Sequence, residues 1–332
     1  MDINAARTLM LAMAGQPMLA HDEGRIAFFN AMPLPDADAA LIAAIDCEQG
    51  FKPQHLSLIK AGYQTGPQMA EGEHVAGLML VTRSRKMNET LLHRAWNAVQ
   101  QGGEIVVCGA KNDGIQALRK FAGEHVGIDR SLSKHHAIAF AFTKSGENPF
   151  PMPAQALSEG LTVGPGMFSA DGPDQGSRLL AQVFSKRIQG KVGDFGAGWG
   201  YLGLELLKSE ARPEVLICHE ADHASLQAAR ANLVAQSSAV AMEFHWSDLT
   251  TENPGSGFDW IVMNPPFHAG RAQDPGIGIA FIATAAKALK PGGRLLMVAN
   301  RKLPYEKALS LHFRQVKTVL EADGFKVVEA MR

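Results

Sequence analysis

The second half of the sequence alternates short apolar runs with longer helical patterns. The apolar runs are rich in Val, Ile, Leu and Phe, and they are the expected strands: 191–198, 214–220, 241–246, 258–264 and 294–300. The expected helices lie between most of them, at 201–209, 225–236 and 276–289. Strands that are apolar along their whole length are typical of a parallel sheet covered by helices on both faces. Residues 315–332 instead predict two strands joined at Asp323-Gly324, an antiparallel hairpin at the edge of the sheet.

The first half shows the same organisation less clearly. Its expected strands are 26–32, 40–46, 75–82, 104–110 and 137–143, and its expected helices are 88–100 and 113–121. In both halves a strand, a polar elbow, a helix, a Gly-Gly turn, a strand and a helix follow one another. The two strands begin 29 residues apart in the first half (75 to 104) and 36 apart in the second (258 to 294). A duplicated domain explains this pattern, although two unrelated α/β domains would also share it.

The chain of 332 residues is long enough for two domains of ordinary size. Residues 146–173 are rich in Pro and Gly, which indicates a linker. We therefore expect one domain over 1–150 and a second over 160–332. The first has neither the glycine-rich turn nor the Asn-Pro-Pro sequence of the second. It is therefore expected to be a copy of the domain that lacks the ligand loop and that serves in recognition.

The charge balance excludes a protein that coats nucleic acid through a general basic excess. Lys and Arg number 32 against 33 Asp and Glu, for a formal net charge of -1. The charges are unevenly spread, because residues 83–144 hold ten basic against five acidic residues, while residues 1–82 hold four against nine. This local excess is either a recognition surface or ordinary variation along a solvated surface. Arg83, Arg85 and Lys86 are the candidate phosphate contacts.

The three cysteines and the apolar runs bear on the cellular compartment. Cys47, Cys108 and Cys218 lie singly in strand-like runs, a pattern that favours buried reduced thiols over disulfides or a zinc site. The N-terminal residues lack the pattern of a signal peptide. No run approaches the roughly 18 apolar residues that span a bilayer. We therefore expect a cytoplasmic protein that binds no metal and no membrane.

A glycine-rich turn follows the first strand of the second half and begins a helix. It has the pattern D-x-G-x-G-x-G from Asp194 onward, and Gly196, Ala197 and Gly198 are expected against a ligand, because glycine allows close approach. Such a turn also occurs in dinucleotide-binding proteins, or without any ligand. The acid that precedes the glycines favours an ammonium group over a pyrophosphate, which it would repel.

Two further acids follow the next two strands. Glu220 lies 26 residues after Asp194, close to the roughly 20-residue spacing at which an acid binds ribose hydroxyls. Asp248 is a candidate acceptor for an adenine amino group, or else the cap of a turn. Glu220 would otherwise be an exposed carboxylate at a strand end. Because the carboxyl ends of parallel strands meet at one edge, the three acids together describe a ligand with an ammonium, a ribose and an adenine, namely S-adenosylmethionine.

Asn264-Pro265-Pro266-Phe267 ends the fourth strand of this half. The prolines fix the backbone and remove two N–H donors, so the Asn264 side-chain oxygen and the Pro265 carbonyl remain as acceptors. Such acceptors can hold a planar NH2 group by both hydrogens, and Phe267 offers a ring on which a base or an amide can stack. Orientation toward a methyl donor would be the main catalytic gain, without an obligatory general base. His268 is either a substrate contact or a structural residue.

With these residues, the sequence resembles the two-domain guanine-N2 methyltransferases of ribosomal RNA, of the small-subunit (16S) methyltransferase C type. The resemblance covers nearly the whole chain and is carried by 264–268, 165–169 and 174–177. Asn-Pro-Pro-aromatic alone is shared by DNA adenine, protein glutamine and rRNA methyltransferases. The Phe-His ending combined with Pro-Gly-x-Phe-Ser is much narrower. Trp199 in the glycine turn is a departure from the family pattern.

The resemblance implies a fold of two tandem Rossmann-like methyltransferase domains. The C-terminal domain would have a mostly parallel seven-stranded sheet, and the N-terminal domain would be a degenerate copy that does not bind the donor. The positions that match donor-binding residues are Asp194, Gly196, Glu220 and Asp248, and those that match the target-base site are Asn264 to Phe267. Phe168, Ser169 and Asp174 would pack beside the pocket, and Phe168 is a candidate substrate contact.

The sequence therefore predicts methyl transfer from S-adenosylmethionine to N2 of a guanine in ribosomal RNA, most simply 16S rRNA. The substrate is either the naked RNA or a ribosomal subunit, and the guanine would be flipped out of its stack. The alternatives are a large-subunit rRNA guanine, a protein glutamine, or a non-catalytic RNA-binding assembly factor. The oligomeric state stays open, and a monomer is compatible with the sequence.

Overall fold

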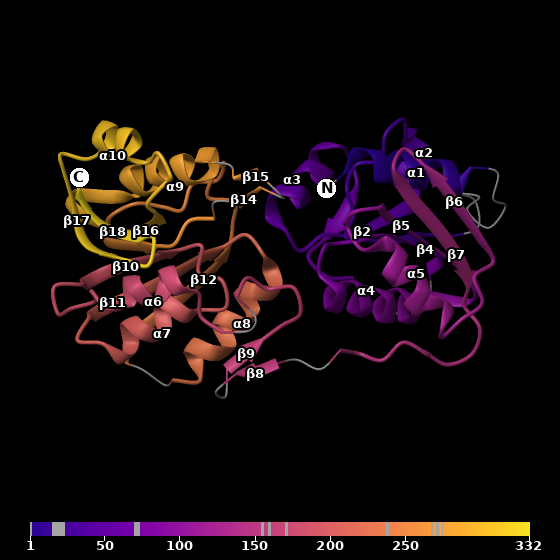
Figure 1. Cartoon of the computed structure of the whole chain (residues 1–332), viewed down its shortest axis with the longest axis horizontal. Coiled ribbons are helices and arrows are strands. Elements are labelled where there is room, and N and C mark those ends of the chain that lie inside the picture. Colours follow the sequence, from indigo (N-terminus) through magenta and orange to yellow (C-terminus); the bar gives the residue numbers. More distant parts are fainter. Residues whose placement is uncertain are drawn as a thin grey trace. The chain divides into compact units, whose positions relative to one another are not determined.

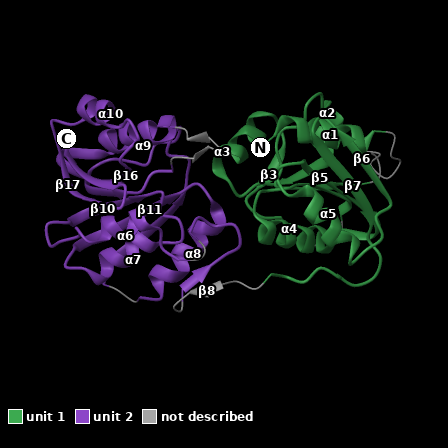
Figure 2. Cartoon of the chain, viewed as in Figure 1, with its two compact units in different colours: residues 1–154 green, residues 155–332 purple. Residues whose placement is uncertain are grey.

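The computed structural model describes residues 2–14, 24–69, 74–153, 156–158, 161–169, 172–236, 239–266, 268–269, 272–273 and 275–332. The chain folds into two compact units, residues 1–154 and residues 155–332 (Figure 2). No helix of the described residues is long and apolar enough to cross a membrane.

Unit 1, residues 1–154, contains one sheet with helices on both faces (Figure 1). Its helices are α1 (Ile3–Met13), α2 (Ala39–Ala44), α3 (Lys52–Lys60), α4 (Arg85–Ala98) and α5 (Ile115–Gly123). Its strands are β1 (Ile26–Phe29), β2 (Ile45–Glu48), β3 (Gln64–Gly66), β4 (His74–Leu80), β5 (Val99–Ala110), β6 (Arg130–Lys134) and β7 (Ala137–Thr143). One hydrophobic core lies between the sheet and α1 to α3, and a second lies between the sheet and α4 and α5.

Unit 2, residues 155–332, has the same layered build. Its helices are α6 (Gln175–Ala181), α7 (Tyr201–Lys208), α8 (His223–Val234), α9 (Pro275–Ala288) and α10 (Glu306–His312). Its main sheet consists of β10 (Gln189–Phe195), β11 (Arg212–Glu220), β12 (Ala241–Trp246), β13 (Phe258–Met263), β16 (Leu289–Asn300), β17 (Gln315–Ala322) and β18 (Phe325–Met331). Two small hairpins pair β8 (Ala156–Ser158) with β9 (Leu161–Val163) and β14 (His268–Ala269) with β15 (Ala272–Gln273). Helices α6 to α8 cover one face, and α9 and α10 cover the other (Figure 1).

The two seven-stranded sheets have one topology. Their strand orders are β3-β2-β1-β4-β5-β7-β6 and β12-β11-β10-β13-β16-β18-β17. In each sheet the first five strands in this order pair in parallel, and the last two are added antiparallel. The antiparallel turn at Asp323-Gly324 is confirmed, because these residues join β17 to β18. The predicted arrangement of two tandem α/β domains with mostly parallel sheets is confirmed.

The correspondence between the units extends to individual hydrogen bonds. In unit 1 the N–H of Ala31 donates to the carbonyl of Glu48 at 3.1 Å, and in unit 2 the N–H of Ala197 donates to the carbonyl of His219 at 3.0 Å. The turn after β1 therefore occupies the place of the glycine turn after β10. The matched hydrogen bonds favour a duplicated domain over two unrelated α/β domains.

One expected strand of unit 1 is wrong in its first part. Residues 40–44 belong to α2, and the strand β2 begins only at Ile45. Asp38 caps this helix, since its carboxylate accepts a hydrogen bond from the N–H of Leu41 at 2.8 Å. A short apolar run is compatible with either structure, and here the N-cap and the Ala-rich composition favour a helix before the strand.

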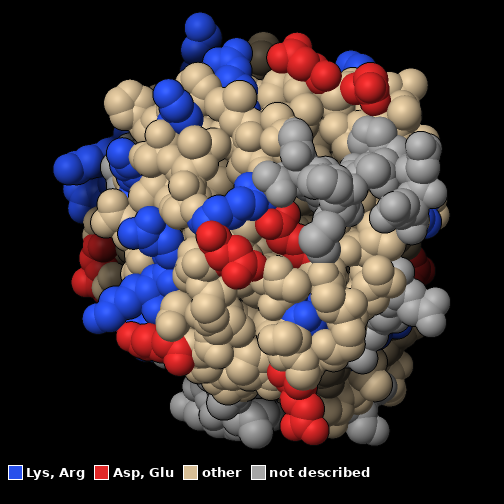
Figure 3. Space-filling model, turned by 90° about the vertical axis from the view of Figure 1, so that its right-hand side faces the viewer, with Lys and Arg blue, Asp and Glu red and all other residues tan. Residues whose placement is uncertain are grey.

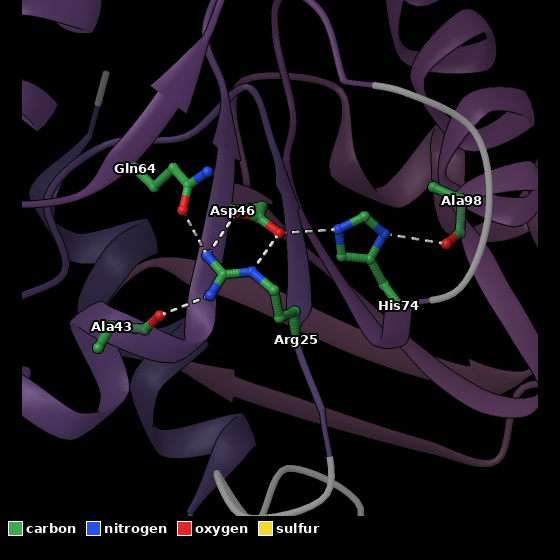
Figure 4. A network of polar contacts seen from close by, with 6 residues as sticks. All are labelled: Arg25, Ala43, Asp46, Gln64, His74 and Ala98. Carbon is green, nitrogen blue, oxygen red and sulfur yellow. Dashed lines mark hydrogen bonds and ion pairs between the residues drawn. The ribbon is translucent and has the colours of Figure 1, made fainter.

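A polar network ties together the amino ends of four strands in unit 1 (Figure 4). The Arg25 guanidinium, just before β1, donates to Asp46 on β2 and to the Gln64 side chain on β3. Nε2 of His74, at the start of β4, lies 3.2 Å from Oδ2 of Asp46. The hydrogen bond from Arg25 lowers the pKa of Asp46, so the carboxylate stays ionised. This network stabilises the edge of the sheet opposite to the carboxyl ends of its parallel strands.

Candidate active site

The glycine turn of unit 2 has a backbone that only glycine adopts easily. Gly196, Gly198 and Gly200 have φ values of 81°, 55° and 95°. The turn is joined to the neighbouring strand β11, because the N–H groups of Gly196 and Ala197 both donate to the carbonyl of His219. A Cβ atom on Gly198 would meet no atom within 4 Å, so this glycine borders open space. The turn therefore exposes backbone to a ligand at Gly198.

Two acids lie close together below this turn. Asp194, at the end of β10, is completely buried, and no hydrogen bond of ordinary geometry reaches its carboxylate oxygens from the described residues, although the backbone of Gly203 lies near enough to lower its pKa. Glu220, at the end of β11, accepts hydrogen bonds from the N–H groups of Gly198 and Asp222, both at 2.8 Å. Burial and then the charge of Glu220 raise the pKa of Asp194 to about 7, and burial raises that of Glu220 to about 7. Neither acid is paired with a cation among the described residues, and each oxygen of Glu220 accepts one backbone hydrogen bond.

Asp248 caps a turn, which is one of the two roles that the sequence predicted for it. Its Oδ1 accepts hydrogen bonds from the N–H and the hydroxyl of Thr250, and its Oδ2 accepts one from the hydroxyl of Thr251. The residue is buried, with 4 % of its surface exposed. These bonds hold the carboxylate in the loop after β12, and they leave Oδ2 with one lone pair for a further donor.

Asn264, the first residue after β13, is held by two residues of another element. Its Nδ2 donates to Oδ2 of Asp174 at 3.1 Å and to Oγ of Ser177 at 2.9 Å. Asp174 caps helix α6, and Ser177 lies in its first turn. The sequence predicted Asn264 as an acceptor and placed Asp174 near the pocket, but it did not reveal this contact. The nearest signal was the Asp-Gln-Gly-Ser sequence that carried part of the family resemblance.

The rest of the Asn-Pro-Pro-Phe sequence is described only in part. Pro265 is buried and Pro266 is exposed. Phe267 lies outside the described residues, so its expected stacking role stays a prediction. His268 is described as backbone of β14 alone, and the role of its side chain stays a prediction as well.

The glycine turn and Asn264 border one pocket, which is open to solvent and measures about 400 Å³ when the adjoining solvent space is included. Its walls come from the glycine turn, the start of α7, the capped start of α6 and the segment before it. The lining residues are Phe168, Ser169, Pro173, Asp174, Ser177, Gly196, Ala197, Gly198, Trp199, Tyr201, Leu202 and Asn264. Phe168 is 62 % exposed, which leaves its ring free for a ligand. The ring of Tyr201, which packs against the buried Trp199 with centroids 5.7 Å apart, is a part of the wall that sequence reasoning missed.

The residues present fit the methyl donor that the sequence predicted. The two unpartnered oxygens of Asp194 and the carboxylate of Glu220 match a ligand that brings positive charge and hydroxyl donors. The open space over Gly198 leaves room for it. Among the described residues, no cluster of three or more His, Cys, Asp and Glu side chains could hold a metal ion.

Unit 1 has none of these groups at the matching positions. The strand registers and the hydrogen bonds described above give the counterparts of Asp194, Glu220 and Asn264, which are Phe28, Gln49 and Leu80. Gln49 uses both ends of its amide internally, donating to the Ala31 carbonyl and accepting from the N–H of Phe51. At these three positions unit 1 thus has two buried apolar side chains and an amide whose two ends are already bonded. The first unit is thus degenerate in its chemistry and not in its fold.

The three predicted phosphate contacts lie on the surface of unit 1. The side chain of Arg83 is 52 % exposed and lies 3.3 Å from Asp113, and that of Arg85 is 79 % exposed and lies 2.7 Å from Glu89. Lys86, in the first turn of α4, is exposed and has no ion pair among the described residues. Arg85 and Lys86 place two positive charges in the first turn of α4, next to the positive end of the helix dipole. This arrangement is unfavourable for the helix, so helix stability does not explain their position.

Comparisons with known proteins identify the family of this chain. Residues 160–329 match the family model "Methyltransferase small domain". The chain is 30% identical to the ribosomal RNA small subunit methyltransferase C of Hahella chejuensis over 278 residues, 80% of this chain and 79% of the relative. It is also 30% identical to the protein of that name from Escherichia coli O7:K1, over 69% of this chain and 67% of the relative.

A solved structure covers almost the whole chain. It is the T. thermophilus 16S rRNA N2 G1207 methyltransferase (RsmC) in complex with AdoMet and guanosine, which is 26% identical. The match has a TM-score of 0.79 and covers 99% of this chain and 91% of that chain. These matches over most of the chain, together with the two-unit fold, show that this chain belongs to the ribosomal RNA small subunit methyltransferase C family.

Proposed function

We propose that this protein transfers a methyl group from S-adenosylmethionine to N2 of a guanine in 16S ribosomal RNA. The observation that carries the proposal is the Asn264 amide, whose nitrogen end is bound by Asp174 and Ser177 and whose oxygen has no partner in the described part of the chain. The pocket that it borders also contains the glycine turn. A nucleophilic amine and a methyl donor would therefore share one pocket. All of its described lining residues belong to unit 2.

The glycine turn and the acids are the proposed donor site. S-adenosylmethionine supplies an electrophilic methyl group on a sulfonium when it is bound. The backbone at Gly196, Ala197 and Gly198 would lie against it, and Glu220 would accept from its ribose hydroxyls. Asp194 is completely buried, so it would act on the positive charge of the bound methyl donor from beneath the glycine turn. The remaining lone pair on Oδ2 of Asp248 would accept from the adenine amino group.

The base would be held by its exocyclic amine. Oδ1 of Asn264 and the carbonyl of Pro265 are the proposed acceptors for its two hydrogens, with Phe267 and Phe168 as stacking surfaces and His268 beside them. An exocyclic amine is a weak nucleophile because its lone pair is delocalised into the ring. Fixing its direction toward the methyl group therefore supplies most of the acceleration. Pro266 keeps the backbone of the segment rigid.

The surface of unit 1 is the proposed site where structured RNA docks. Of the ten basic residues in 83–144, Arg94 and Arg130 are used in ion pairs with the buried Glu48 and Glu104. Arg83, Arg85 and Lys86 remain exposed for phosphates. Figure 3 shows that Lys and Arg gather on one side of the face that it views. An rRNA substrate also leads us to expect that the protein acts in the cytoplasm.

A transfer assay tests the proposed function. Radiolabelled S-adenosylmethionine is incubated with the protein and with 16S rRNA, assembled small subunits, 23S rRNA or a protein extract. We expect label in guanine of 16S rRNA, and we expect Asn264→Ala to reduce transfer by about a hundredfold or more while donor affinity stays within about twofold. Label in protein glutamine or in 23S rRNA would support the alternative enzymes. Donor binding without transfer to any substrate would support an assembly factor.

A further inference from the structure

The side-chain amide of Asn264 is bound at one end only. Both described hydrogen bonds are made by Nδ2, to Asp174 and to Ser177, and Oδ1 has no partner among the described residues. A carboxylate has no proton to give, so only the NH2 end of the amide can face Asp174. The chemistry of the neighbours therefore determines which end of the amide faces the pocket.

Asp174 is itself firmly placed. Its Oδ1 accepts from the N–H groups of Gly176 and Ser177 at 2.9 Å and 3.3 Å, which makes it the N-cap of α6. Ser177 is 8 % exposed, so its hydroxyl is largely shielded from competing water. The helix start thus offers two fixed acceptors, and a side-chain rotation of Asp174 would break its cap bonds.

We propose that Asp174 and Ser177 are positioning residues, which keep the Asn264 amide turned with its oxygen toward the amine that is methylated. This inference rests on the proposed function, because it assigns a role to residues of the same site. Neither residue needs to touch the substrate. They act through the amide of Asn264.

The orientation matters because an amide can present either a donor or an acceptor. With Oδ1 toward the pocket, Asn264 accepts a hydrogen from the substrate NH2 group. With the amide reversed, two NH2 groups would face each other, and the base would lose a hydrogen bond and its alignment. The bond from Nδ2 to a carboxylate also polarises the amide, which makes Oδ1 a stronger acceptor.

The variant Asp174→Asn tests the proposal without removing the helix cap, because Asn and Asp are equally good N-caps. Its new NH2 group would face Asn264 and turn the amide around. The matched control is Asp38→Asn, which exchanges the N-cap of α2 in unit 1 far in sequence from the pocket. The measurement is the affinity of the full chain for guanosine and for inosine, which lacks the 2-amino group, together with donor affinity and the kcat of methyl transfer.

We expect the wild type and the control to prefer guanosine, by roughly tenfold. In Asp174→Asn this preference disappears and kcat falls on the order of a hundredfold, while donor affinity stays within about twofold. A merely structural role would weaken guanosine and inosine binding together. Ser177→Ala provides a second variant with an intact cap, and it should reduce the preference in the same direction but less.

A guanosine preference that is unchanged in both variants would overturn the proposal. That outcome differs from failure of the proposed function. If the proposed function failed, the wild type itself would show no preference for guanosine over inosine and no transfer to guanine.

Discussion

The two acids of the donor site are the residues whose ionisation should respond to a ligand. Asp194 and Glu220 have pKa values raised from 3.8 and 4.5 to about 7, chiefly because of burial. In the free protein near neutral pH each carboxyl group is therefore only partly ionised. A ligand that brings a positive charge and hydroxyl donors favours the ionised forms, so donor binding releases protons.

We predict that donor affinity increases with pH. Between about pH 6 and about pH 8, the affinity should rise roughly tenfold for each carboxylate that must be ionised for binding. Isothermal titration calorimetry at several pH values measures this, and the dependence should weaken in Asp194→Asn. An affinity for S-adenosylhomocysteine or S-adenosylmethionine that does not change over this range would contradict the role of both acids.

The raised pKa values make donor affinity increase with pH, but they make the stability of the free protein decrease with pH. In the unfolded chain these acids ionise near their ordinary pKa values, whereas in the folded chain they hold their protons up to about pH 7. Folding thus takes up protons between about pH 4 and about pH 7. The contribution of these two groups to the free energy of unfolding should therefore fall as pH rises through that window.

The sequence predicted the positions of the site residues better than their hydrogen bonds. Asp194, Glu220 and Asn264 were predictable because each ends a strand of one parallel sheet, and strand ends meet at one edge. The depth of Asp194 and the capping bonds of Asp248 were not predictable, since both depend on how loops close over the sheet. The contact of Asn264 with Asp174 joins residues 90 positions apart, which no local pattern reveals.

The glycine turn is the central element of the proposed donor site, and two of its positions require glycine for different reasons. Gly198 has a φ of 55° and open space at its Cβ position, whereas Gly200 has a φ of 95° and would place a Cβ 3.1 Å from the Cα of Ala229 in helix α8. Gly198 thus borders the ligand space, and Gly200 allows two helices to pack closely.

We predict that alanine at these two positions separates binding from stability. Gly198→Ala should cost about 1 kcal/mol of the free energy of unfolding, from the left-handed backbone, but reduce donor affinity roughly tenfold or more. Gly200→Ala should cost about 2–4 kcal/mol, because strain and close contact with Ala229 add. Urea unfolding and donor titration of both variants measure this. The assignment fails if Gly198→Ala binds the donor as tightly as the wild type.

At the level of elements, the parallel strands were the most predictable and the short helices the least. The strands of unit 2 are apolar throughout and are separated by clear helical patterns, so their order along the chain could be predicted. Helix α2 was missed because six apolar and Ala-rich residues run directly into β2 without a break. The choice between helix and strand there depends on the cap at Asp38 and on packing, which the hydrophobic pattern does not contain.

The whole molecule contains one topology used twice with different chemistry. Both sheets have the same strand order. Their turn hydrogen bonds also match, since the backbone N–H of Lys111 donates to the His136 carbonyl and the backbone N–H of Arg301 donates to the Gly324 carbonyl. Unit 2 has Asp194, Glu220 and Asn264 at the ends of its strands, where the matching positions of unit 1 hold Phe28, Gln49 and Leu80. Within unit 1, residues 83–144 hold ten basic against five acidic residues, and this local excess suits contact with RNA phosphates.

We predict that removing these cations weakens RNA binding and its dependence on salt. The variant Arg83→Gln, Arg85→Gln, Lys86→Gln should reduce affinity for 16S rRNA at low salt, and the slope of log affinity against log salt should decrease by about 2–3. A matched triple variant neutralises the exposed Lys60, Lys186 and Lys307, with the same change in net charge. Equal slopes in the two triple variants would show that the three residues make no specific phosphate contacts.

Nucleoside mass spectrometry of ribosomal RNA, compared between cells that have this protein and cells that lack it, tests the central claim most directly. The account predicts that one N2-methylguanine is missing from 16S rRNA in the deficient cells and returns when the wild-type protein, but not Asn264→Ala, is supplied. An unchanged set of methylated guanines in 16S rRNA would contradict it.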